Sequence, residues 1–304
     1  MLDLIIIGAG PAGLSAAIYG KRAGLELVVL EKAYMGGGQI LSADKVDNYP
    51  GLPGINGFDM GMKFQEHAEA LGAGIREAKV EEITACDGFF RVRTTEEMLE
   101  SRTVIYATGA AHSHLGVPGE EELAGKGVSY CATCDGAFFR KKTVAVVGGG
   151  DVALGDAVYL SALCEKVYLI HRRDTFRGAD SLQKKVRGAD NIEILYNSVV
   201  EEISGQDRVE TIRVKHLQSG QQTQLSISGI FVAVGTRPET KPLQGLAEMD
   251  EKGYVYAGED CATGVPGLYV AGDIRNKPMR QVITAVADGA NAAVCAAEYI
   301  RTGC

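Results

Sequence analysis

The chain has 304 residues, of which 46% are hydrophobic and 23% charged, and its formal net charge is −8. This length accommodates two domains, and the composition is ordinary for a globular α/β protein. The negative charge argues against broad nucleic-acid binding, and no apolar run reaches the roughly 18 residues that span a membrane. The run Leu4–Ile7 is too short for a signal-peptide core, so we expect a cytoplasmic protein.

Residues 2–7 are expected to form a buried parallel strand that leads directly into a glycine-rich turn and a helix. The turn, GAGPAG, matches the dinucleotide-binding fingerprint in the strand–turn–helix context that gives this motif its meaning. Its first glycine permits a tight turn, its second lets the backbone approach a pyrophosphate, and its third lets the helix pack on the strand. The cofactor-binding residues predicted here are Gly8, Gly10, Pro11, Ala12 and Gly13.

The next predicted strand, residues 27–30, ends at Glu31, which lies 18 residues after Gly13. A carboxylate in that place accepts hydrogen bonds from ribose hydroxyls but repels a 2′-phosphate, so this site is expected to take FAD or NAD rather than NADP. The alternative is a glycine-rich turn beside a solvated glutamate. Two later loops could wrap around an extended ligand or be ordinary loops, and they contribute Gly38, Gln39 and Asn48.

Residues 58–71 are expected to be helical, and residues 75–105 alternate as several short strands do. The last of these strands leads to Gly109. Residues 111–118 have no clear periodicity and are expected to be a linker.

Cys131 and Cys134 follow this linker, two residues apart. The chain has 7 cysteines, an odd and scattered set that does not suggest a secreted disulfide framework. In a reducing compartment a lone CxxC pair is redox-active or half of a zinc site. Zinc would need two more ligands, for which His112 and His114 are candidates, but we expect a redox dithiol and no metal.

A second fingerprint begins 140 residues after the first, again behind a predicted buried strand, residues 143–147. Alanine takes the third glycine position, which the motif allows. A helix is expected from Leu154 to Leu163 and a strand over residues 166–170. The cofactor-binding residues predicted in this copy are Gly148, Gly150, Asp151, Val152 and Ala153.

The two copies differ in charge where their second strands end. His171 has the offset from the fingerprint that Glu31 has in the first copy, and a basic cluster follows it. Guanidinium groups grip phosphate bidentately, so this second site is predicted to bind the 2′-phosphate of NADPH. The alternative is an exposed basic turn. The residues predicted to bind NADPH in this cluster are His171, Arg172, Arg173 and Arg177.

Residues 193–234 again suggest short strands, with a hairpin turn at 218–221, so the chain contains two similar units. A second linker is expected at 236–242. A later strand ends in Gly272 and Asp273, before an alanine-rich helix that follows. Because ligands bind at the carboxyl ends of parallel strands, Gly272 and Asp273 are predicted to contact the ribityl or phosphate region of a flavin.

These motifs resemble those of the low-molecular-weight, bacterial-type thioredoxin reductases, in class II of the pyridine nucleotide-disulfide oxidoreductase family. The combination of CATCDG with HRRxxxR is highly specific, and the resemblance covers essentially the whole chain, including Arg280 and Gln281 as cofactor-binding residues. It implies an α/β fold with two Rossmann-like, three-layer ββα dinucleotide-binding domains. The FAD domain would be discontinuous, residues 1–112 and 241–304, with an inserted NADPH domain, residues 113–240, carrying the dithiol.

The resemblance further implies a homodimeric thioredoxin-disulfide reductase. It would pass electrons from NADPH through FAD to the Cys131–Cys134 dithiol and on to oxidised thioredoxin, with one domain rotating against the other. Cys134 would then lie next to the flavin, Cys131 would attack the substrate disulfide, and Asp135 is the candidate acid/base. One residue departs from the family pattern, because Gly155 replaces an acidic residue of many members. Cys304 is a lone terminal thiol outside the CxxC pair.

Other functions are compatible with the same motifs. One is a reductase for another dithiol partner, glutaredoxin-like or peroxiredoxin-linked. A second takes electrons from ferredoxin, against which the basic cluster argues. A third, from a different class, is a redox sensor or FAD-binding scaffold without turnover.

Overall fold

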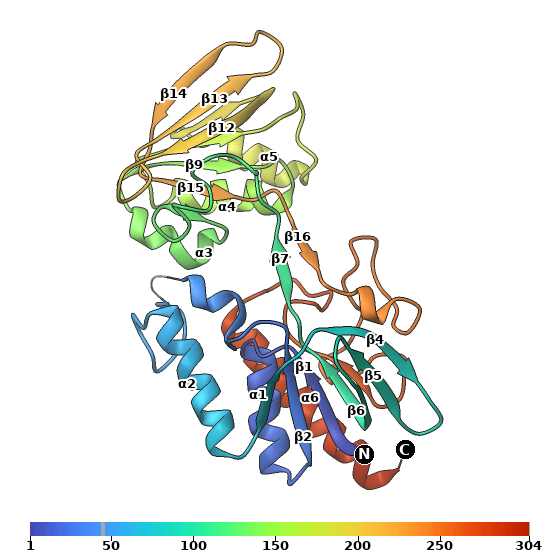
Figure 1. The fold of residues 1–304 in the computed structure, drawn as a ribbon. Helices are drawn as coiled ribbons and strands as arrows, with labels where there is room; N and C mark the ends of the chain where they lie inside the picture. The colour runs from blue at the N-terminus through green and yellow to red at the C-terminus, as the bar shows by residue number, and fades with distance from the viewer. Residues whose placement is uncertain (44–45, 304) are drawn as a thin grey trace. The chain divides into compact units, whose positions relative to one another are not determined.

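The computed structural model describes residues 1–43 and 46–303, so Cys304 lies outside the described part (Figure 1). The chain divides into two compact units, one made of Met1–Ala111 with Arg237–Cys304 and the other of His112–Thr236. The chain passes from one to the other at β7 (Ala110–His112) and β16 (Thr236–Pro238), which pair in a two-stranded sheet. The linker expected at 111–118 therefore begins with a strand.

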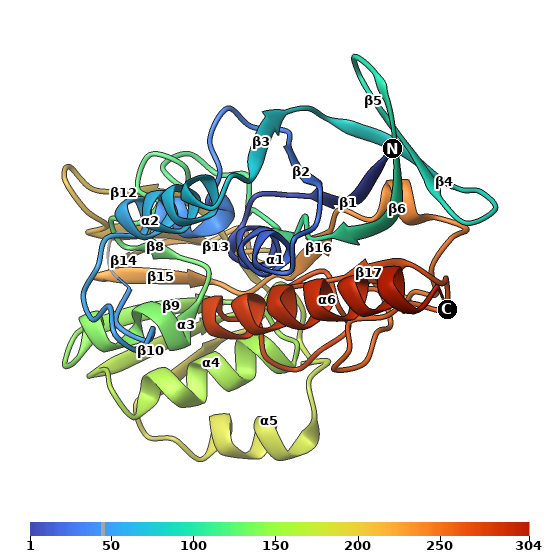
Figure 2. The same cartoon turned by 90° about the horizontal axis from the view of Figure 1, so that it is seen from below.

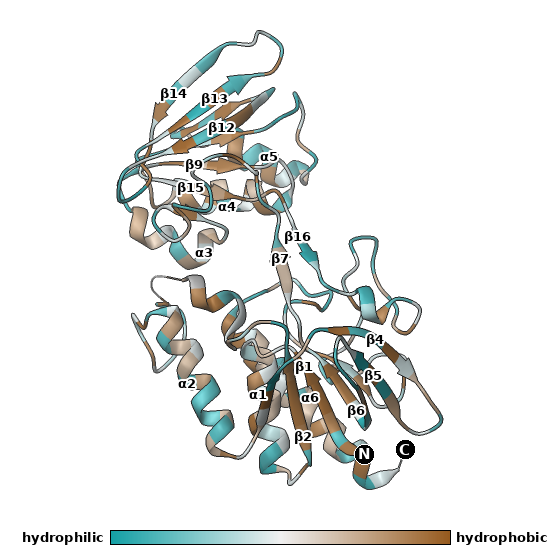
Figure 3. Ribbon diagram, in the orientation of Figure 1, coloured by the Kyte–Doolittle hydropathy of each residue, from teal (hydrophilic) through white to brown (hydrophobic). Residues whose placement is uncertain are grey.

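The first unit is built on a seven-stranded sheet with the order β3-β2-β1-β6-β5-β4, in which β17 also pairs with β6. Strands β3, β2, β1, β6 and β17 pair with one another in parallel. Strand β5 is antiparallel to both of its neighbours, β6 and β4. The apolar runs of β1, β2 and β17 explain why these strands are buried, and β1 and β2 are strongly hydrophobic in Figure 3. The strands are β1 (Leu2–Ile7), β2 (Leu27–Glu31), β3 (Gly74–Glu77), β4 (Val80–Ala85), β5 (Phe90–Thr94), β6 (Met98–Tyr106) and β17 (Leu268–Val270).

Helices cover one face of the parallel strands of this sheet. The β4–β5 hairpin, at one end of the same sheet, packs with neighbouring loops over the other face, around a second apolar core. Helices α1 (Pro11–Arg22) and α6 (Val282–Thr302) lie side by side (Figure 2). Their backbones approach so closely that a Cβ at Gly289 would lie 2.0 Å from the carbonyl oxygen of Ala12. The remaining helices of the unit are α2 (Gly57–Ala70), η1 (Gly38–Ser42) and η3 (Lys241–Leu243).

The second unit has a five-stranded parallel sheet with the order β11-β10-β9-β15-β8 and a separate antiparallel sheet, β12-β13-β14. One apolar core lies between the two sheets and another lies under α4. Its strands are β8 (Val128–Ser129), β9 (Thr143–Val147), β10 (Lys166–Ile170), β11 (Ile192–Leu195), β12 (Ser198–Ser204), β13 (Thr211–His216), β14 (Gln222–Ser226) and β15 (Gly229–Val232). Its helices are α3 (Ala132–Asp135), η2 (Gly136–Phe139), α4 (Asp151–Ser161) and α5 (Asp180–Arg187).

Both units thus have helices on a mostly parallel sheet with a second β layer behind it, which confirms the predicted α/β class. The helix expected from Leu154 begins earlier, at Asp151, because its first turn is built on the glycine loop rather than on apolar periodicity. In the described part of the chain, no helix combines the length and apolar character of a membrane-spanning segment.

Candidate cofactor and dithiol sites

The first glycine turn connects β1 to α1. Gly8 has φ +102°, and a Cβ there would lie 2.5 Å from the carbonyl oxygen of Ala107 on the neighbouring strand ending. A Cβ at Gly13 would lie 1.8 Å from the oxygen of Gly8, so helix and strand meet only because this residue is glycine. At Gly10, by contrast, a Cβ would meet nothing within 4 Å. The turn therefore leaves open space at the N-terminus of α1, which suits a pyrophosphate.

Glu31, at the end of β2, reaches back to this turn. Its carboxylate accepts hydrogen bonds from the N–H groups of Ala9 at 2.7 Å and Ala33 at 3.1 Å. The acid is therefore held beside the glycine loop by the backbone, at the carboxyl edge of the parallel strands. That is the place at which a ribose hydroxyl would meet it.

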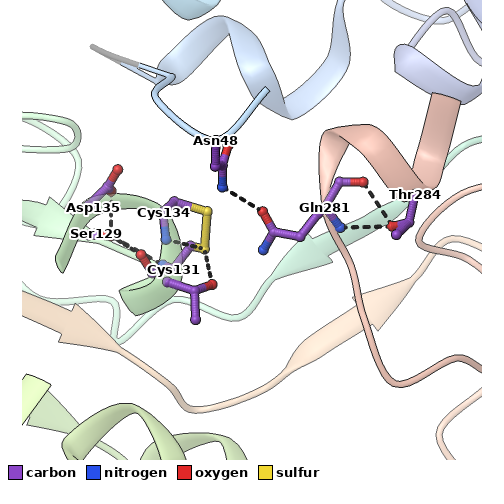
Figure 4. The surroundings of a disulfide bond; sticks show 8 residues. Asn48, Ser129, Cys131, Cys134, Asp135, Gln281 and Thr284 are labelled. Atoms are coloured by element: carbon purple, nitrogen blue, oxygen red, sulfur yellow. Dashed lines mark hydrogen bonds between the residues drawn. A yellow bond between two sulfur atoms is a disulfide. The ribbon is translucent and has the colours of Figure 1, made fainter. Parts of the chain in front are cut away.

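In the loops of the first unit, side chains predicted to bind the cofactor contact residues from distant parts of the sequence. Gln39 in η1 donates from Nε2 to the oxygen of Ala110 at 2.5 Å, and this amide lies 3.8 Å from the Cβ position of Gly109. Asn48 donates from Nδ2 to Oε1 of Gln281 at 3.0 Å, as Figure 4 shows. Gln281 is also the N-cap of α6.

Asp273 follows β17 and carries a buried oxygen, Oδ1, for which the described residues provide no hydrogen-bond partner. Burial raises the pKa of this carboxyl. A buried acceptor without a protein donor fits a ligand hydroxyl, as a ribityl chain would supply. Arg280, predicted to bind the cofactor, lies over the ring of Tyr254 with 4.1 Å between guanidinium carbon and centroid. Its Nε donates to the backbone carbonyl oxygen of Asp273 at 3.2 Å.

An ionic cluster that no sequence motif predicted lies next to this segment. Asp288, in α6, accepts from Gly272 N at 2.9 Å, from Arg275 at 2.5 Å and from Lys277 at 2.8 Å. Asp288 and Arg275 are buried, so their charges are paired where water is scarce. The only hint of this cluster in the sequence is Asp288, an acidic residue in an alanine-rich helical segment. The cluster fixes the backbone at Gly272, immediately before Asp273.

The second glycine turn, between β9 and α4, repeats the geometry of the first. A Cβ at Gly148 would lie 2.4 Å from the oxygen of Ala233, and at Gly150 it would again meet nothing within 4 Å. The two N-cap residues have nearly the same conformation, with φ −74° and ψ −176° at Gly10 and φ −98° and ψ −177° at Gly150. The second unit therefore presents a second open helix N-terminus of the same kind.

The loop between β10 and α5, residues 171–179, carries Arg172, Arg173 and Arg177 and is called the arginine loop. It is attached to this turn through backbone hydrogen bonds. The N–H groups of Arg177 and Gly178 donate to the oxygen of Gly149 at 2.8 and 3.2 Å. Asp151 accepts from Ala179 N at 2.7 Å, so its carboxylate ties α4 to the same loop. Val152 and the guanidinium-bearing residues Arg172, Arg173 and Arg177 are exposed.

His171 lies beneath the loop, unlike the arginines that follow it. It is 5% exposed, and its Nε2 lies 3.0 Å from the backbone carbonyl oxygen of Thr175. Its ring packs on Phe176, with 5.3 Å between centroids. Burial, chiefly, and then the three neighbouring arginines lower the pKa of His171, although the bond to Thr175 opposes them. The enclosed ring therefore supports the loop from beneath.

Cys131 and Cys134 form a disulfide at the start of α3, with 5.3 Å between their Cα atoms (Figure 4). Cys131 is the N-cap of this short helix, and its sulfur accepts from Cys134 N at 3.2 Å. The carboxylate of Asp135 accepts a hydrogen bond from the hydroxyl of Ser129 at 2.6 Å. In the described residues, Cys86, Cys164, Cys261 and Cys295 are free thiols.

The two histidines considered as zinc ligands lie around Tyr130 instead. His112 stacks on its ring at 5.0 Å, and His114 Nδ1 lies 2.8 Å from its hydroxyl. That hydroxyl also donates to the buried carboxylate of Glu120 at 3.0 Å. Across residues 1–43 and 46–303, no three His, Cys, Asp or Glu side chains gather in a way that could hold a metal ion.

The class of protein follows from the fold and these turns together with comparisons to known proteins. The family model for pyridine nucleotide-disulphide oxidoreductases matches residues 2–289, and the chain belongs to that family, among the low-molecular-weight, bacterial-type thioredoxin reductases. The resemblance noted in the sequence is thereby confirmed.

Particular relatives are similar along nearly their whole length. A thioredoxin reductase of Treponema pallidum is 43% identical over 99% of this chain and 97% of its own. One from Listeria innocua is 40% identical over 98% of this chain and 94% of its own. The crystal structure of thioredoxin reductase from Streptococcus pyogenes has a TM-score of 0.96 at 39% identity, covering 99% of both chains.

Proposed function

We propose that this oxidoreductase is an NADPH-dependent thioredoxin-disulfide reductase that contains FAD. The observation that carries the proposal is the disulfide Cys131–Cys134. It lies in a chain whose two glycine turns have the same geometry, while the strand after each turn ends in opposite charge, Glu31 in one unit and Arg172 with Arg173 in the other. A bound flavin supplies a two-electron relay between a nicotinamide and a disulfide, which side chains alone cannot provide. Thioredoxin is inferred as substrate because the similar proteins are thioredoxin reductases.

The first unit is assigned to FAD. Its open helix N-terminus would receive the pyrophosphate, and Glu31 would accept from the ribose. The buried oxygen of Asp273 would accept from a ligand hydroxyl. The other residues proposed to line this site are Gly8, Gly10, Pro11, Ala12, Gly13, Gly38, Gln39, Asn48, Gly109, Gly272, Arg280 and Gln281.

The second unit is assigned to NADPH. The exposed guanidinium groups of Arg172, Arg173 and Arg177 would bind the 2′-phosphate, and the turn at Gly148–Ala153 would bind the pyrophosphate. His171 supports the loop from beneath, and Asp151 attaches it to α4. The dithiol belongs to the same unit.

The dithiol would then carry two electrons to thioredoxin. Cys131, as a thiolate, would attack the disulfide of thioredoxin to form a mixed disulfide, which Cys134 would resolve. Asp135 would hold and return the proton that this exchange requires. The proposal also includes rotation of one unit against the other about β7 and β16, because two paired connections suit a hinge. It further includes a homodimer and a cytoplasmic location.

Anaerobic titration of the purified protein with NADPH, followed by addition of a bacterial thioredoxin, tests the proposal. The yellow flavin absorbance should bleach with NADPH and return on addition of oxidised thioredoxin. NADH should be much less effective. A colourless protein, equal use of both nucleotides, or unchanged turnover after both Cys131→Ser and Cys134→Ser would contradict the proposal.

A further inference from the structure

The side chain of Ser129 lies between the dithiol backbone and the proposed acid/base. Ser129 is 5% exposed and ends β8, two residues before Cys131. Its hydroxyl oxygen lies 2.6 Å from Oδ2 of Asp135, 3.1 Å from Cys131 N and 3.3 Å from the oxygen of Cys131 (Figure 4). A serine hydroxyl has one proton to donate and two positions that accept. The backbone N–H takes one acceptor position, which leaves the proton and the other acceptor position to be shared between Asp135 and the oxygen of Cys131.

We propose that Ser129 is a positioning residue that holds Asp135 in both of its protonation states. With Asp135 ionised, the hydroxyl donates to the carboxylate. With Asp135 protonated, the carboxyl proton is donated to Ser129 and the hydroxyl turns its own proton to the oxygen of Cys131. Every donor keeps an acceptor in either state, so the acid does not leave its place when the proton moves.

This inference rests on the proposed function, because it gives Asp135 a proton to move. Reduction of the Cys131–Cys134 disulfide breaks the S–S bond and adds two electrons, which the proposed pathway from NADPH supplies. One proton from Asp135 then leaves one thiol, one thiolate and an ionised Asp135. Ser129 stabilises the ionised product, since a hydrogen bond to a carboxylate favours its charged form.

The test compares Ser129→Ala in two backgrounds, the native holoenzyme and Asp135→Asn. A bacterial thioredoxin and the small disulfide dithiobis(nitrobenzoate) serve as substrates. In the native background, kcat/KM at pH 7 should fall about tenfold, and the acid side of the pH profile should move to higher pH by roughly one unit. In the Asp135→Asn background the same change should cost less than about twofold, because the carboxyl whose proton Ser129 would help to hold is already lost.

Ser129→Thr keeps the hydroxyl and should restore activity to within about threefold of native. Ser101→Ala is the matched control, since Ser101 is also buried and its hydroxyl donates to the backbone carbonyl oxygen of Thr103 within the first unit. An equal fall in both backgrounds would show that Ser129 merely supports the turn and would overturn the inference, as would a pH profile that does not move. If native enzyme reduces the small disulfide but not thioredoxin, the proposed substrate is wrong. The comparison of Ser129→Ala in the two backgrounds, made with the small disulfide, then still tests the role of Ser129. If it reduces neither, both proposals fail.

Discussion

The ring of His171 occupies the space where Gly149 would carry a side chain: a Cβ built on Gly149 would lie 2.2 Å from Cε1 and Nδ1 of the histidine. The same Gly149 offers its oxygen to the two N–H groups of the arginine loop. The middle residue of the second glycine turn therefore connects the part proposed to bind pyrophosphate with the part proposed to bind the 2′-phosphate. His171 is the support on which both depend.

This relationship predicts two kinds of variant. His171→Ala should raise KM for NADPH and for NADH by similar factors, because it loosens the turn that both nucleotides need. Arg173→Ala should raise KM for NADPH by about tenfold or more and leave NADH nearly unchanged, since only the 2′-phosphate is affected. Steady-state kinetics with both nucleotides measures this. A selective loss of NADPH use in His171→Ala would instead indicate that the histidine itself contacts the phosphate.

Asp135→Asn should reduce disulfide turnover by about 10²-fold while FAD remains bound and still bleaches with NADPH. The amide is close in size to the carboxylate and can still contact Ser129, but it cannot take up a proton. Rapid mixing separates the two half-reactions. Nearly intact turnover would reduce Asp135 to an ordinary acid at a helix start.

Removal of the flavin should lower stability, and Asp273→Ala should reduce the effect of adding it back. At a ligand concentration of 100 times Kd, binding contributes about 2.7 kcal/mol to the free energy of unfolding. The thermal midpoint should therefore rise on addition of FAD to the native apoprotein and rise much less in Asp273→Ala. Asp87→Ala, at an exposed turn, is the control. An equal rise in all three proteins would exclude Asp273 from the site.

Gly155, the departure from the family pattern, lies within α4 with nothing within 4 Å of its Cβ position. Gly155→Ala should therefore raise the free energy of unfolding by roughly 0.5–1 kcal/mol, because alanine restricts the unfolded chain and favours the helix. Gly289→Ala, also in a helix, should do the opposite, since its Cβ would collide with Ala12. Denaturant unfolding of both variants, with bound FAD matched, measures the contrast.

Asp156 is expected to make the stability of the folded protein depend on pH. Burial raises its pKa from the ordinary 3.8 to about 6. Because the folded state binds this proton more tightly than the unfolded state, stability falls as pH rises from about 4 to 6 and stays lower above that range. Asp156→Asn should therefore stabilise the protein more at pH 7.5 than at pH 5. Exposed Asp190→Asn should show no such difference, and a larger gain at pH 5 for Asp156→Asn would reverse the assignment.

The sequence alone was sufficient to predict both glycine turns, the charge difference between their second strands and the dithiol. These are short-range features: a strand, a tight turn and a helix N-terminus occupy consecutive residues, and their chemistry follows from residue type and spacing. The strand order, the ionic cluster at Asp288, the hydrogen bond from Asn48 to Gln281 and the bond from Ser129 to Asp135 required the tertiary structure. The same holds for His171, which the sequence grouped with the arginines and the fold buried beneath Gly149. Burial and partnership depend on which segments converge and which rotamers their packing permits, and neither is encoded in the spacing of a motif.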